Sequence, residues 1–166
     1  MAEAEVAARA KDTAAQRLEH ALGVAYVYLG HRDRTVAETR GRLAAKGIDE
    51  PTIAAAVAEL VEQGYLDDQR FARRFAEDRR NLDDWGAERI EQRLRALGIA
   101  RDLAAAATGA DALGSELEAA IALLQRRFPQ PPADARQRNR ALGLLIRRGY
   151  ESELAHDAIR AHAREE

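Results

Sequence analysis

The stretch RLAAKGI at residues 42–48 recurs as RLRALGI at residues 93–99 and as LLIRRGY at residues 144–150. Each copy places a leucine four residues before a glycine, and a large apolar residue directly after that glycine. The leucines fall at positions 43, 94 and 145, so both intervals are 51 residues. Two equal intervals predict a tandem repeat of three units.

Each copy has the pattern of a helix end that is followed at once by a new helix. Glycine closes a helix in the left-handed conformation without a Cβ penalty, and the apolar residue after it packs back on the last turn. Asp49 is the expected N-cap of the next helix, with Pro51 tolerated in its first turn. The segments 35–38 and 115–118 have the capping-box pattern and start two further helices.

Apolar residues recur at helical spacings of three and four, as in Ile90, Leu94 and Leu97, and no stretch alternates as a strand would. We therefore predict an all-α fold, an elongated array of three tandem three-helix repeats with about nine helices. The predicted helices span residues 18–30, 35–46, 50–63, 68–80, 86–97, 101–108, 114–127, 134–148 and 152–163. The predicted organisation is a flexible N-terminal segment 1–17 followed by repeats 18–66, 67–110 and 111–166.

Composition narrows the protein class. The 166 residues contain no cysteine, which excludes disulfides and thiolate zinc sites. The N-terminal stretch is acidic and alanine-rich without an apolar core, and no run of 18 apolar residues occurs, so we expect neither a secretory signal nor a membrane span. These features are typical of a cytoplasmic protein.

Charge is distributed by helix, although the net charge is only −2. The middle helix of each predicted repeat is basic, whereas residues 49–68 hold six acids and no base. A basic stripe suits an acidic protein surface, a nucleic-acid backbone, or both. The first helix–glycine–helix element resembles a helix-turn-helix, but its second helix carries only acids, which phosphates would repel.

The sequence offers no catalytic constellation. The four histidines have no metal-ligand spacing, and no phosphate-binding glycine loop or nucleophile elbow is present. The pair Asp67-Asp68 stands where a helix must start, so N-capping is its favoured role. Tyr65 and Trp85 are expected to pack in the core or a hinge rather than to anchor a partner. We therefore predict a protein that is not an enzyme, with no catalytic residue, no metal site and no cofactor.

The central part of the chain resembles the RecX family, whose members regulate the RecA recombinase. The resemblance rests on a G-Y-L-D-D-x-x-F-A block and on a second block that ends in glycine and isoleucine, and it extends more loosely over residues 20–163. The matching residues, which we expect to be mostly structural, are Gly64, Tyr65, Leu66, Asp67, Asp68, Phe71, Ala72, Trp85, Gly86, Ile90, Leu94 and Gly98. The loop 81–84 departs from the family, because it is acidic where the family often has a basic residue or glycine.

The resemblance implies three three-helix repeats, cytoplasmic location and binding to the RecA–single-stranded DNA filament. It also implies that growth, disassembly, ATP hydrolysis, strand exchange and coprotease activity of the filament are modulated, mainly by inhibition, in recombination and SOS repair. The chain is expected to act as a monomer, with at most weak direct contact to DNA. A DNA-binding protein and a helical-repeat adaptor for another partner are the alternatives. The hypothetical partner-binding residues are Arg73, Arg74, Arg79, Arg80, Arg89, Arg93, Arg147 and Arg148.

Overall fold

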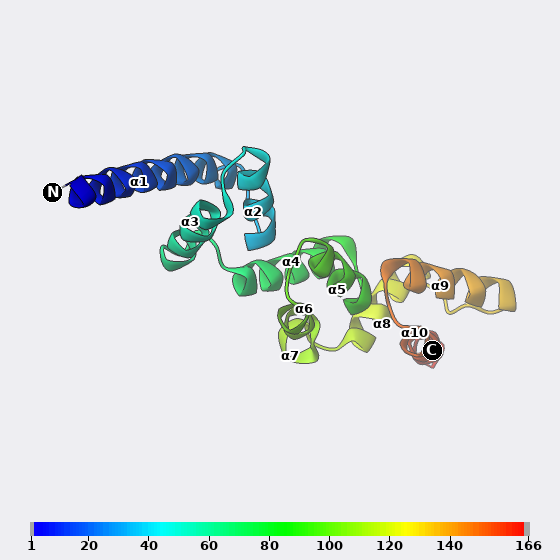
Figure 1. Cartoon of the computed structure of the whole chain (residues 1–166). Helices are drawn as coiled ribbons and strands as arrows, with labels where there is room; N and C mark the ends of the chain where they lie inside the picture. Colours follow the sequence, from blue (N-terminus) through cyan, green and yellow to red (C-terminus); the bar gives the residue numbers. More distant parts are fainter. Residues whose placement is uncertain (1, 165–166) are drawn as a thin grey trace. The chain divides into compact units, whose positions relative to one another are not determined.

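Figure 1 shows the computed structural model, which describes residues 2–164, with side chains from residue 13 onward except residue 113. These residues form ten α-helices and no strand, so the all-α prediction is confirmed. The helices are α1 (Ala2–Leu29), α2 (Val36–Ala45), α3 (Glu50–Glu62), α4 (Asp68–Asp83), α5 (Ala87–Ala96), α6 (Arg101–Thr108), α7 (Ala110–Leu113), α8 (Glu116–Arg127), α9 (Ala135–Arg148) and α10 (Ser152–His162).

Nine of these helices correspond to the predicted ones, and the differences have simple causes. The helix expected over 18–30 begins at Ala2, because the preceding residues are rich in alanine, glutamate and arginine and contain no glycine or proline. The additional helix α7 is one turn between Gly109 and Gly114, at the predicted joint of repeats two and three. Flexibility of segment 1–17 stays a prediction, and its first residue lies outside the described part of the chain.

The repeated glycine stretch forms the same turn three times. The glycines at 47, 98 and 149 have φ of 76°, 87° and 88°, the left-handed region in which a side chain is strained. In each copy the amide after the glycine donates to the carbonyl of the leucine five residues earlier, at 3.3, 3.1 and 3.1 Å. This is the Schellman hydrogen bond, which explains why leucine and glycine keep their spacing.

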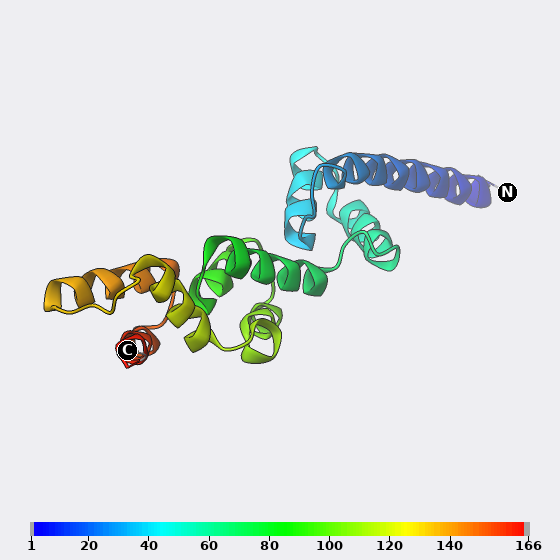
Figure 2. The same ribbon diagram turned by 180° about the vertical axis from the view of Figure 1, so that it is seen from behind.

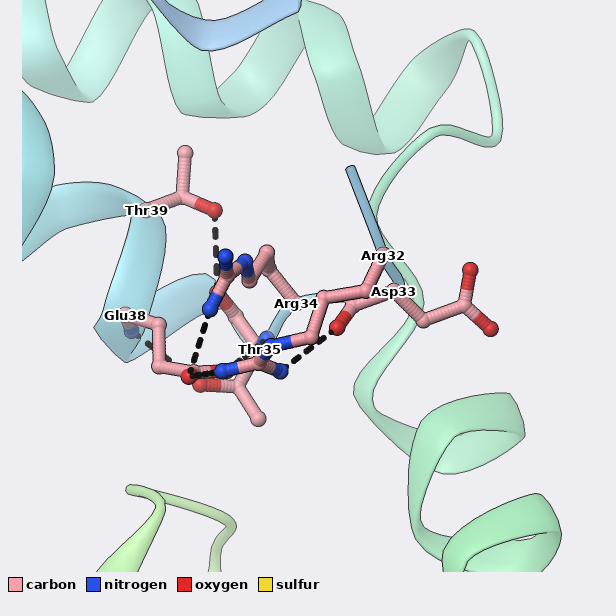
Figure 3. Close-up of polar contacts among 6 residues, drawn as sticks. All are labelled: Arg32, Asp33, Arg34, Thr35, Glu38 and Thr39. Carbon is pink, nitrogen blue, oxygen red and sulfur yellow. Dashed lines mark hydrogen bonds and ion pairs between the residues drawn. The ribbon is translucent and has the colours of Figure 1, made fainter. Parts of the chain in front are cut away.

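A capping box with an ion-pair network starts α2 (Figure 3). The Thr35 hydroxyl accepts from the Glu38 amide at 3.1 Å, and the Glu38 carboxylate accepts from the Thr35 amide at 3.0 Å. Arg32 and Arg34 reach the same carboxylate at 2.5 and 3.6 Å. Burial would raise the pKa of Glu38, but the Thr35 hydrogen bond and the two arginines outweigh it and hold this pKa below its usual value.

Helices α8 and α9 also begin with side-chain caps. Ser115 accepts from the Glu118 amide at 3.3 Å, and Asp134 accepts from the Gln137 amide at 2.7 Å. Asp49 occupies the predicted N-cap position of α3, but its carboxylate accepts from the Thr52 hydroxyl at 2.7 Å and makes no backbone cap.

The described chain divides into two compact units, Met1–Phe71 and Ala72–Glu166, each taken separately. In the first unit, hereafter unit 1, α1 packs on α2 and α3, and α2 packs on α3. Small side chains on α1 and α3 let these helices approach closely around the larger leucines. The buried core of unit 1 comprises Ala21, Ala25, Leu43, Ile53, Ala56, Val57, Leu60 and Leu66.

The second unit, hereafter unit 2, combines two helix groups. Helix α5 packs on α6, and α10 lies beside α8 and α9, as the red, yellow and orange ribbons show from both sides (Figures 1 and 2). Leu94 of α5 and Leu145 of α9, the repeated leucines, are fully buried. The core around α8–α10 comprises Ala120, Leu123, Leu124, Ala141, Leu145, Tyr150, Ala155, Ala158 and Ile159.

A carboxylate from a later helix caps the first turn of α2, and another caps the first turn of α5. Asp67 caps its own helix by accepting from the Arg70 amide at 2.9 Å, as expected for this pair. Asp68 instead accepts from the Val36 amide, the first of α2, at 2.9 Å. In unit 2 the Glu116 carboxylate accepts from the Ala87 amide, the first of α5, at 2.6 Å. In both cases the acid is the first residue of a later helix, α4 or α8. Its carboxylate accepts a hydrogen bond from an amide that has no partner within its own helix.

Candidate interaction surface

The eight arginines proposed for partner binding lie in different environments of unit 2. Arg73, Arg74 and Arg93 are exposed on α4 and α5. Contacts within unit 2, described below, engage the side chains of Arg79, Arg80, Arg89 and Arg148 and the backbone carbonyl of Arg147.

Trp85 lies between two of these arginines. The Arg89 guanidinium lies 4.1 Å from the Trp85 ring centroid, and the Arg79 guanidinium lies 5.7 Å from it. Arg79 is also 5.4 Å from the Phe75 ring and forms an ion pair with Asp83. Cation–π contacts of this kind stabilise the arrangement, so Trp85 contributes to packing within unit 2.

The end of α9 abuts the start of α5. The Gly86 amide donates to the Arg148 carbonyl at 2.8 Å, and the Arg89 side chain donates to the Arg147 carbonyl at 2.9 Å. The Arg148 guanidinium donates to the Asp83 carbonyl. A Cβ atom at Gly86 would overlap the Gly149 carbonyl, so only glycine fits there.

Arg80 is the buried member of the set. Its side chain is 8% exposed, and Nη2 lies 3.8 Å from the Glu116 carboxylate, while Nε and Nη1 have no hydrogen-bond partner. Its guanidinium also lies 5.7 Å from the Tyr150 ring. A side chain buried to this extent offers little surface to another molecule.

The acidic segment 81–84 was predicted as a loop, but residues 81–83 form the end of α4. This segment has structural roles that its charge alone did not reveal. Asp83 pairs with Arg79, and Asp84, whose φ is 55°, pairs with Arg126 of α8. The departure from the family pattern therefore connects α4 to α8 inside unit 2.

Several residues of the central motif make contacts within the fold, and the expectation that the motif is mostly structural stays a prediction. Gly64 has φ 79° after α3, Leu66 is buried, and Asp67 and Asp68 cap helices. Tyr65 is 56% exposed, so it does not lie in a core, and packing in a hinge stays a prediction. Its ring meets that of Tyr26 edge-on at a centroid distance of 5.2 Å, on the surface of unit 1.

A groove between the end of α8 and α9 holds a basic site of which the sequence analysis proposed only Arg147 for partner binding. It has a volume of about 790 Å³ and is lined by Arg127, Arg136, Arg140 and Arg147 together with Phe128, Asn139 and Leu144. Positions 136, 140 and 147 follow the spacing of four and seven that defines one helix face. That spacing was the signal in the sequence that could have identified this face.

The described part of the chain contains neither a metal-ligand cluster nor a membrane-spanning helix. Side chains of histidine, aspartate and glutamate form no group of three or more that could hold a metal ion in this part of the chain. Within the same residues, no helix has the length and apolar character needed to cross a membrane.

Three consecutive three-helix groups define the class of tandem helical-repeat proteins. Family models for the first, second and third three-helix domains of RecX match residues 21–60, 67–107 and 115–159, in that order. The chain belongs to the RecX family of regulatory proteins.

Relatives support this assignment over most of the chain. The regulatory protein RecX of Trichlorobacter lovleyi is 38% identical over 127 residues, which cover 74% of this chain and 82% of that protein. The RecX protein of Mycobacterium sp. (strain JLS) is 30% identical over 154 residues, 89% of this chain and 84% of that protein. The crystal structure of RecX from Lactobacillus salivarius has the same fold, with a TM-score of 0.76 at 21% identity over 89% of this chain and 97% of that one.

Proposed function

We propose that this protein binds the RecA–single-stranded DNA filament in the cytoplasm and regulates it, mainly by inhibition. The regulated properties are filament growth and disassembly, ATP hydrolysis, strand exchange and coprotease activity in recombination and SOS repair. The observation that carries the proposal is the match of three RecX domains in order along the chain. The protein acts by contact, as a monomer and without catalysis of its own.

Tandem repeats give the chain several surfaces that can contact neighbouring protomers of a polymer. Once one surface is bound, the next binds at a high effective concentration, so affinity rises where protomers are adjacent. This would favour the filament over free RecA and predicts inhibition at low ratios of regulator to RecA.

The exposed arginines of unit 2 are the proposed electrostatic contacts. Arg73, Arg74 and Arg93 are exposed, whereas Arg79, Arg80 and Arg148 are engaged in the packing of unit 2. Exposed charges act mainly on the association rate and are screened by salt. We therefore narrow the proposed contact surface to the first three, with Arg89 and Arg147 as exposed neighbours.

The test is a double charge reversal on α4. The variant Arg73→Glu/Arg74→Glu should inhibit RecA ATP hydrolysis less than the wild type, with a larger difference at low than at high salt. Its matched control is Arg160→Glu/Arg164→Glu, which makes the same change of charge at exposed positions outside the proposed surface. Equal inhibition by both variants, with unchanged circular dichroism, would reject this surface.

An adaptor for a partner other than RecA is the competing function. It predicts that the wild-type protein leaves RecA activities unchanged while it still folds as described. The charge-reversal experiment therefore includes the wild-type protein as its first comparison.

A further inference from the structure

We infer that the groove between α8 and α9, hereafter the arginine groove, binds the phosphate backbone of single-stranded DNA directly. The inference goes beyond the proposed function, because it concerns naked DNA and requires no RecA. Four guanidinium groups line this groove, from Arg127 on α8 and from Arg136, Arg140 and Arg147 on α9, and its lining contains no carboxylate.

The arginines of the groove differ from their neighbours in how they are used. Just outside it, Arg126 pairs with Asp84, Arg148 donates to the Asp83 carbonyl and Arg138 donates to the Ala133 carbonyl. The guanidiniums inside the groove form no ion pair with a described carboxylate of the chain. Their charge therefore serves no internal contact and is available to an anion from outside.

The arrangement of the charges selects an extended anion over a single one. Three of the arginines lie on one face of α9, and the first and last are eleven positions apart, about 16 Å along the helix axis. One phosphate cannot reach all of them, whereas a chain of phosphates can. A basic groove of this length is a feature of proteins that bind nucleic acid through its backbone.

The remaining lining favours a single strand over a duplex or a peptide. Phe128 and Leu144 are half-buried and give the groove an apolar side, against which an unpaired base can stack, and Asn139 offers an amide. In a duplex the bases are stacked inside and cannot use such a surface. The carboxylates of an acidic peptide could pair with the arginines of the groove. Such a peptide has no planar ring to stack on Phe128.

The test measures binding of a fluorescent oligothymidylate to the purified full-length chain by anisotropy, without RecA, over a range of salt concentrations. If each of the four arginines contacts one phosphate, the logarithm of affinity should fall with the logarithm of salt with a slope of about −2.8. The variant Arg136→Gln/Arg140→Gln should bind more weakly with a slope of about −1.4. The control Arg160→Gln/Arg164→Gln, with the same change of charge, should keep the wild-type slope.

Three results would overturn the inference. The first is equal affinity and slope for the wild type and the groove variant. The second is stronger displacement of the oligothymidylate by duplex DNA than by a single strand of the same length. The third is binding of polyglutamate in place of the oligothymidylate, which would identify a site for acidic peptide. Because RecA is absent, each result is independent of the ATP hydrolysis tests.

Discussion

Replacing Glu116 by alanine should destabilise unit 2, because this carboxylate serves two groups at once. It accepts from the first amide of α5, that of Ala87, at 2.6 Å. It is also the acidic partner of the buried Arg80, at 3.8 Å. The substitution Glu116→Ala therefore removes a helix cap and leaves a cation without its counter-charge.

The magnitude follows from the two contacts. Loss of a side-chain cap costs about 1 kcal/mol. Breaking a fully buried ion pair costs ~3–5 kcal/mol, but the long distance and the 25% exposure of Glu116 reduce this contribution to about 1–2 kcal/mol. We expect Glu116→Ala to lower the free energy of unfolding by about 2–3 kcal/mol. Glu116→Gln keeps an acceptor for the amide, so its cost should be about 1–2 kcal/mol.

The assay is urea unfolding followed by tryptophan fluorescence, because the one tryptophan of the chain, Trp85, lies in unit 2. The variant Arg80→Met/Glu116→Ala completes a double-mutant cycle and should recover part of the loss, since it removes the unpaired cation. A loss below about 0.5 kcal/mol for Glu116→Ala, or no coupling in the cycle, would refute this account of the buried pair.

Three further predictions concern the joints between helices. Gly86→Ala should cost about 3 kcal/mol or more, because its Cβ meets backbone, whereas Gly41→Ala, in open space within α2, should stabilise by about 0.5–1 kcal/mol in the same urea titration. Burial, Asp67 and Glu38 raise the pKa of Asp68 although the α2 amide lowers it, so Asp68→Asn should be at least as stable as the wild type at neutral pH, and Asp68→Ala should lose about 1 kcal/mol. Because the pKa of Glu38 is lowered in the folded state, this carboxylate stabilises unit 1 at pH values above 4.5, its unfolded pKa. The stabilisation is lost as the pH falls through the folded pKa. Glu38→Gln should therefore make stability, followed by circular dichroism, depend less on pH in the acid range.

The fold was predictable because it depends on local signals. The spacing of leucine and glycine set the three helix ends, and the capping patterns that begin at Thr35 and Ser115 marked helix starts that the structure confirms. The long start of α1 was missed, because its helix propensity comes from alanine, glutamate and arginine and shows no apolar stripe.

The interaction surface was less predictable, because it depends on contacts distant in the sequence. Arg80 and Arg148 look like surface charges, but one meets Glu116 and the other the Asp83 carbonyl, 65 residues away. The role of Gly86 likewise depends on Gly149, which only the packed structure brings to it. The pattern of charges along a helix predicts which residues share a face. It does not predict which of these faces another helix covers.

The central claim is regulation of the RecA filament, and the most direct measurement is DNA-dependent ATP hydrolysis by preformed filaments of RecA from the same organism. The wild-type protein is added at ratios well below one per RecA protomer. The account predicts a fall in the rate at these low ratios, because one regulator acts on several adjacent protomers. An unchanged rate up to equimolar protein, with the fold verified by circular dichroism, would contradict it.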